Sequence, residues 1–130
     1  LYRLVGSEMC IRDRLIEWIR LLLERPALID SLNLPEILMR RALDKSTEVV
    51  VKITLCLAKL TDYNRDIGLK LSQRLIKRNE IEIRRSMADV LTRLFRRLSV
   101  DALPFFEKML QDDDEVVLAA QELYSQQSTD

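Results

Sequence analysis

The side chains that could carry chemistry in this chain are few, and their densest cluster is acidic. Asp112, Asp113, Asp114 and Glu115 follow one another directly. Such a run could bind a cation, or its oxygens could cap the start of a helix by accepting hydrogen bonds from the free N–H groups of the first turn. We favour capping. The chain has no histidine, so neither a Ser-His-Asp nor a Cys-His catalytic group can be assembled from it.

Cysteine and glycine usage restricts the chemistry further. Cys10 and Cys56 are the 2 cysteines, too few for a Cys/His zinc site, and we expect Cys56 to be a small buried apolar residue rather than a reactive thiol. Gly6 and Gly68 are the 2 glycines and cannot form a glycine-rich phosphate loop. We therefore predict a protein that is not an enzyme, with no catalytic residue, no metal and no cofactor.

Charge is unevenly distributed, although 21 basic residues balance 21 acidic ones. The zero net charge gives no general attraction to nucleic acid. The charged residues of the range 70–97 are mostly basic, whereas those of the range 101–122 are mostly acidic. Such runs usually form solvated faces and ion pairs, but a basic ridge could also bind an acidic partner or a nucleic-acid backbone. The residues of this alternative ridge are Arg74, Lys77, Arg78, Arg84, Arg93 and Arg97.

The elements that must position these side chains are predicted to be helices in a repeating pattern. Candidate capping residues recur at a 33-residue step in two series, Asn33, Asp66, Ser99 and Ser46, Asn79, Asp112. A run of helix-forming residues follows each of them. The pattern predicts three antiparallel helix pairs over residues 33–65, 66–98 and 99–126, followed by a short tail to residue 130.

The residues before the first pair are expected to be of two kinds. Residues 15–32 read as half a unit with a connector, because apolar residues from Leu15 to Leu23 have helical spacing and Pro26 ends the helix. Trp18 lies in this helix, and we expect it to pack in the core. Residues 1–14 fall outside the repeat, and the stretch 5–13 is similar to a translated sequencing-library adaptor. We therefore expect a gene fragment that begins with a non-native segment.

Apolar positions repeat with the same step. The equivalent positions are Val50, Ile83 and Val116, then Leu57, Val90 and Leu123, then Ala58, Leu91 and Tyr124. One helix pair cannot cover its own apolar face and must stack on the next. The segment 49–57 alternates like a strand, but its place in the repeat favours helix. The sequence thus predicts an all-α fold, an α-solenoid of stacked antiparallel helix pairs. No segment approaches the ~20 apolar residues of a membrane span, and we expect a cytoplasmic protein with no membrane contact.

The third unit resembles a HEAT repeat of the short, bilin-lyase-associated (PBS-lyase-type) kind. The resemblance rests on residues 102–110 and 112–120, where an acidic turn is followed by valine and then by paired alanines. Residues 82–85 of the second unit are similar to the valine-arginine sequence found in repeats of that family. The resemblance implies a HEAT-like solenoid whose second helices line a concave surface, and it leaves open a bilin-lyase-like enzyme or accessory subunit.

If that geometry applies, outward positions on the second helices are candidate contacts for a protein partner. Helical phase selects Lys52, Lys59, Arg85, Asp89 and Arg96. We predict a scaffold that mediates protein–protein interaction, with a partner whose identity the sequence does not reveal. Binding of a nucleic-acid backbone through the basic ridge at residues 74–97 is the alternative.

Overall fold

A computed structural model describes residues 14–120 and 122, without the side chains of Phe95, Arg96 and Ser99. The adaptor-like stretch 5–13, the predicted core residues Leu123 and Tyr124, and the tail lie outside the described residues. Within the described ranges all regular secondary structure is helical and none is strand, which confirms the all-α prediction. In the segment 49–57, where local alternation alone suggested a strand, residues 49–54 and 57 are helical and residues 55 and 56 form a turn.

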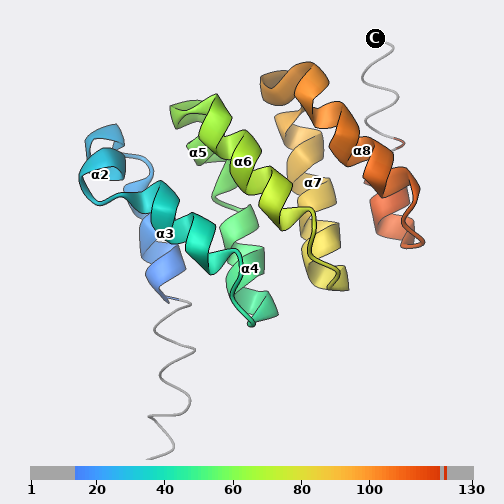
Figure 1. Cartoon of the computed structure of the whole chain (residues 1–130), viewed down its shortest axis with the longest axis horizontal. Coiled ribbons are helices and arrows are strands. Elements are labelled where there is room, and N and C mark those ends of the chain that lie inside the picture. Colours follow the sequence, from blue (N-terminus) through green and yellow to red (C-terminus); the bar gives the residue numbers. More distant parts are fainter. Residues whose placement is uncertain (1–13, 121, 123–130) are drawn as a thin grey trace, which may run out of the picture.

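The helices form two layers (Figure 1). Residues 14–22 are helical, and so are residues 115–120. Between them lie α2 (Pro26–Ser31), α3 (Leu34–Arg41), α4 (Thr47–Thr54), α5 (Leu57–Tyr63), α6 (Arg65–Leu75), α7 (Ile81–Leu98), the 3₁₀ helix η1 (Ser99–Ala102) and α8 (Leu103–Leu110). In Figure 1 α3, α6 and α8 lie in front, and residues 14–22, α4 with α5, and α7 lie behind them. In the part described, no helix is both long and apolar enough to cross a membrane.

The predicted helix starts are partly wrong in detail. Ser46 caps α4 as predicted, because its side chain accepts a hydrogen bond from the Val49 N–H at 3.4 Å. Asp66 does not cap α6, since Asn64 accepts from the N–H groups of Asp66 and Ile67 instead. Asn33 directly precedes α3, but it has a φ of 52° and makes no side-chain cap.

The remaining three expected caps are also displaced. Ser99 begins the 3₁₀ helix η1, and α8 starts after Ala102 without a side-chain cap. Asn79 lies two positions before the first residue of α7. Asp112 lies too early in the turn, because Asp114 accepts the hydrogen bonds from the Val116 and Val117 N–H groups. Side-chain type alone does not distinguish a cap from a polar residue in the neighbouring turn.

The turn before α4 recurs in the same form before residues 115–120. Asp44 accepts a hydrogen bond from the Ser46 N–H at 2.8 Å, and Asp112 accepts from the Asp114 N–H at 2.9 Å. Ser46 and Asp114 then cap the helices that follow. These two caps are separated by two units, so the repeat step at this position is (114 − 46)/2 = 34 rather than 33.

The longer step corrects the predicted core positions. Val116, expected in the core, is 47% exposed, whereas Val117 is 1% exposed. With a step of 34, Val117 is equivalent to Ile83 and Val49, which are also buried. Leu91 is fully buried and is equivalent to Leu57 rather than to the partly exposed Ala58. Apolar faces are wide in this chain, so a one-residue error in the step still matched apolar residues to one another.

The second helix of the pair predicted over residues 33–65 is broken into α4 and α5. Between them Leu55 and Cys56 donate to Lys52 and Ile53, three residues back, as in a 3₁₀ turn. The Thr54 hydroxyl donates to the Val51 carbonyl, an acceptor of the helical ladder, and such side-chain competition bends helices. The tight turn changes the helical phase, so Leu55 is 39% exposed and Cys56 is buried.

Candidate protein-binding surface

Three of the predicted contact residues lie on the second-layer surface, by which we mean the exposed side of residues 14–22, α4, α5 and α7. The Lys52 ammonium lies 2.6 Å from Glu17, and the Lys59 ammonium lies 3.5 Å from Glu24. Asp89 pairs with Arg93 one turn along α7, at 3.2 Å. Exposed pairs of this kind contribute only about 0–1 kcal/mol. Their charges can therefore change partners at little cost.

A groove of about 270 Å³ crosses this surface and touches all three of its helical rows. We call it the inner groove. Its floor is apolar and its rim carries three cations and one carboxylate, and it is lined by Arg20, Glu24, Leu55, Ala58, Lys59, Val90 and Arg93. An apolar floor with a basic rim suits an apolar side chain that has an acidic neighbour.

Trp18 and Leu21 are exposed apolar residues of the helix over residues 14–22, which also supplies Arg20 to the inner groove. Trp18 is 64% exposed and Leu21 is 71% exposed, so the prediction that Trp18 packs in the core is wrong. The helix over residues 14–22 buries Ile16 and Ile19 instead. Trp18 and Leu21 are one turn apart on the opposite side of this helix. A helix with apolar residues on several faces can bury only those that meet a neighbour.

Among the predicted contact residues whose side chains the structure describes, Lys59 lines this groove and Lys52, Asp89 and Arg85 do not. Arg85 lies 3.0 Å from Asp114, on the turn before residues 115–120. Its hydrogen bond to the carboxylate, more than any other contact, lowers the pKa of Asp114, which also accepts the capping N–H bonds. Arg85 therefore stabilises the chain's own fold. The side chain of Arg96 lies outside the described part.

The basic ridge is divided among contacts between neighbouring units. The Arg74 guanidinium donates to the Met39 carbonyl at 2.9 Å, and Arg78 donates to the carbonyls of Ala42 and Asp44 at 2.9 and 2.8 Å. These acceptors lie at or just beyond the end of α3, where helix carbonyls lack partners and carry partial negative charge. Two of the predicted ridge residues thus attach α6 and its following turn to the previous unit.

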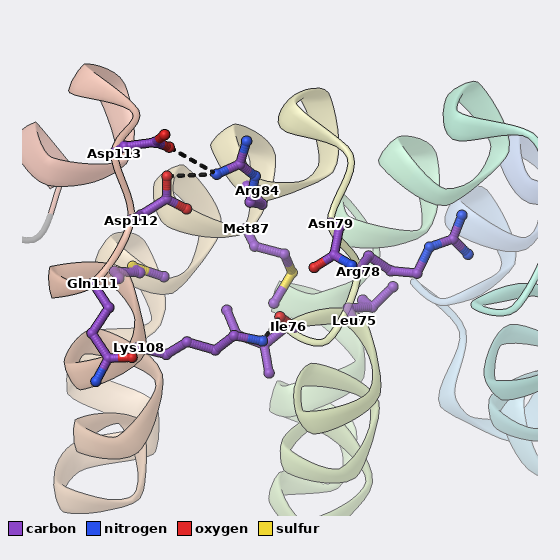
Figure 2. A pocket seen from close by; sticks show the side chains of 11 residues that line it. Leu75, Ile76, Arg78, Asn79, Arg84, Met87, Lys108, Gln111, Asp112 and Asp113 are labelled. Atoms are coloured by element: carbon purple, nitrogen blue, oxygen red, sulfur yellow. Dashed lines mark hydrogen bonds and ion pairs between the residues drawn. The ribbon is translucent and has the colours of Figure 1, made fainter.

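The remaining ridge residues lie on α7 and in the turn before it. Arg84 lies 2.6 Å from Asp112 (Figure 2), and Arg97 lies 2.6 Å from Asp62 of α5. Arg93 lines the inner groove, and Lys77 is exposed. The charged run is therefore largely a set of ion pairs and carbonyl contacts, the simpler interpretation of its sequence.

The Arg78–Glu80 pair makes the fold sensitive to acid. Its hydrogen bonds are the main reason why the pKa of Glu80 falls from 4.5 to about 2. The folded chain then binds this proton less readily than the unfolded chain, so the pair stabilises the fold above about pH 4.5 and its contribution is lost as the pH falls towards 2.

We expect Glu80→Gln to be less stable than the unchanged protein at pH 6, with the difference shrinking as the pH approaches 2. Urea unfolding at pH 6, 4 and 3 measures this dependence. Glu82→Gln, two residues further on in the first turn of α7, is the matched control. A destabilisation by Glu80→Gln that is the same at all three pH values would contradict the role of the pair.

The remaining candidate residues are Cys56 and the acidic run at residues 112–115, and their surroundings are those of residues that stabilise the fold. Cys56 is free and buried, and burial raises the pKa of its thiol to about 12, as befits an unreactive residue. In the acidic run, Asp112 and Asp114 accept backbone N–H bonds, which agrees with the capping interpretation. Over the described residues, no group of three or more histidine, cysteine or acidic residues could hold a metal ion.

Comparison of the chain with known proteins finds no matching family model, no similar curated protein and no similar solved structure. The HEAT resemblance therefore rests on the sequence pattern alone.

Proposed function

We propose that this chain is a HEAT-like helical-repeat scaffold, an α-solenoid of stacked helix pairs, that binds another protein and performs no catalysis itself. The two layers in Figure 1, with α3 beside α6 and α4 beside α7, support this architecture. The recurrence of one turn and one set of buried positions at a step of 34 supports it as well. Such scaffolds bind partners over extended surfaces. In this proposal the scaffold is cytoplasmic, and a bilin-lyase-like subunit remains an alternative that rests on resemblance alone.

The inner groove is the observation that carries the proposal. Arg20, Lys59 and Arg93 line it together with a single acidic residue, Glu24. Lys59 is 51% exposed and Arg93 is 74% exposed, and each takes part in an exposed ion pair. We infer a partner segment that carries Asp or Glu beside an apolar side chain.

Selection of binders from a displayed random-peptide library tests this function. We expect the selected peptides to carry acidic residues next to an apolar one and to bind Lys59→Glu/Arg93→Glu at least about tenfold more weakly, because two attractive charges become repulsive. The melting temperature should be nearly unchanged, since both side chains are exposed. Lys70→Glu/Lys77→Glu on the opposite layer is the matched control. Equal affinity for both double variants would refute the inner groove as the binding site.

A second groove favours nucleic acid as the second candidate. It has a volume of about 270 Å³ and is lined by Met39, Lys70, Gln73, Arg74 and Lys77, with no carboxylate among them. Lys70 and Lys77 are exposed. If they bind phosphates, affinity for a labelled single-stranded oligonucleotide should fall steeply with salt. The slope of log K against log salt should decrease by about 0.7 for each of the two lysines replaced by glutamine. A flat salt response would exclude this function.

A further inference from the structure

A separate cavity lies between the end of α6 and α8, and it shares no residue with the inner groove. Its volume is about 410 Å³, within the range of small-molecule sites. Figure 2 shows α8 and the turn after it on one side, with the α6–α7 turn on the other. Because neighbouring units supply its two sides, the cavity exists only where they meet.

The inner wall of this cavity is apolar and adaptable. Leu75 and Ile76 come from the end of α6, Met87 from α7 and Met109 from α8. Methionine side chains are flexible and polarisable, and they adjust to differently shaped apolar ligands. This wall suits a hydrocarbon chain or ring rather than a fully polar molecule.

Two cationic side chains lie at the rim, Arg84 and Lys108. Arg84 Nη1 lies 2.6 Å from Asp112. The Lys108 ammonium donates to the Ile76 carbonyl at 2.7 Å, and no described carboxylate lies within ion-pair distance of it. An ammonium group without a carboxylate partner can form charge-assisted hydrogen bonds with the carboxylate of a ligand.

The acidic residues at the same rim limit the charge that the cavity accepts. Asp112 is already engaged by Arg84 and by the Asp114 N–H. The Asp113 side chain is 98% exposed and lies 3.7 Å from Arg84. A ligand with one negative charge can reach Arg84 and Lys108, whereas a second negative charge would meet these aspartates and be repelled.

We propose that this cavity binds a small apolar monocarboxylate, with its apolar part against Met87 and Met109 and its carboxylate at Arg84 and Lys108. This inference is independent of the partner-binding function, because the two sites share no residue. The oxygens of the carboxylate would accept hydrogen bonds from the Lys108 ammonium, and the Arg84 guanidinium, which also lines the cavity, would add a second positive charge. Charge-assisted bonds of this kind are stronger than neutral ones.

Methyl NMR of the full chain with ¹³C-labelled methionine tests the proposal with octanoate as the probe. We expect the Met87 and Met109 methyl signals to shift together as octanoate is added, while that of Met39, which lies outside the cavity, stays in place. Octan-1-ol, which has the same chain without the charge, should bind about tenfold more weakly, and octanedioate should bind more weakly than octanoate.

The variants Lys108→Gln and Lys77→Gln complete the test. Lys108→Gln should weaken octanoate binding about tenfold and leave octan-1-ol binding nearly unchanged, whereas Lys77→Gln, outside the cavity, should affect neither. Equal affinity of the unchanged protein for octanoate and octan-1-ol would overturn the carboxylate site, even if Lys108→Gln failed to fold. Absence of shifts at Met87 and Met109, or an equal shift at Met39, would overturn the cavity as the site.

Discussion

Replacing Leu91 with alanine should lower the free energy of unfolding by about 2–5 kcal/mol, because the side chain is fully buried and the lost methyl groups leave a cavity. Leu91 lies near the middle of α7, which contacts α4, α5 and α6. These contacts belong to three different helices, so the surrounding atoms cannot easily collapse into the space. Urea unfolding followed by far-ultraviolet circular dichroism measures the loss.

Arg93→Ala on the same helix is the matched control for Leu91→Ala. The Arg93 side chain is 74% exposed and pairs with Asp89, which is itself exposed, so its removal should change the unfolding free energy by no more than about 0.5 kcal/mol. The comparison separates core packing from changes in helix propensity, since alanine replaces both residues. A loss below about 1 kcal/mol for Leu91→Ala would show that this position is not in the core.

Gly68→Ala should destabilise the protein by about 1–3 kcal/mol or more, although alanine is normally favoured in a helix by about 1 kcal/mol. Gly68 lies in α6 where it crosses α5. A Cβ atom at this position would lie 2.9 Å from both the Cα and the Cβ of Thr61, and would overlap its hydroxyl oxygen. The Cα atom belongs to the backbone, so the clash cannot be relieved by a rotamer change alone. The two helices would have to move apart.

The direction of the change in unfolding free energy makes Gly68→Ala informative, because helix propensity and the contact with Thr61 predict opposite signs. Gln73→Ala, an exposed position in the same helix, should be neutral or slightly stabilising by the same unfolding measurement. Combining Gly68→Ala with Thr61→Ala should restore only part of the stability, since the hydroxyl is removed but the backbone contact remains. If Gly68→Ala stabilises the chain, α5 and α6 do not approach each other as closely as the structure shows.

The groups that could bind a ligand were only partly predictable. Lys59 was found from helical phase, but the inner groove also needs Leu55 and Arg20, which were missed. Leu55 lies four residues before Lys59, on the same side of a continuous helix, and this was the available signal. The 3₁₀ turn between α4 and α5 decides that Leu55 rather than Cys56 is exposed, and no pattern in this segment revealed that turn.

Arg85 and Arg78 show the limit of reading charge from sequence. Both were candidates for contact with another molecule, yet Arg85 binds Asp114 and Arg78 binds two carbonyls and Glu80. Except for Glu80, these partners belong to a neighbouring unit of the repeat and are distant in sequence. A charged residue looks the same in sequence whether its partner is another molecule or a neighbouring helix.

From the amino-acid sequence alone, the all-helical class, the approximate helix order and the lack of histidine-dependent chemistry could be derived. Helical periodicity and residue type are local properties, and they survive a small error in the repeat step. The step of 34 at the helix caps, the exposure of Trp18 and the pairing of the arginines depended on the tertiary structure. They are decided by which helix faces meet, and a burial site or an ion pair between distant residues exists only once those faces are packed.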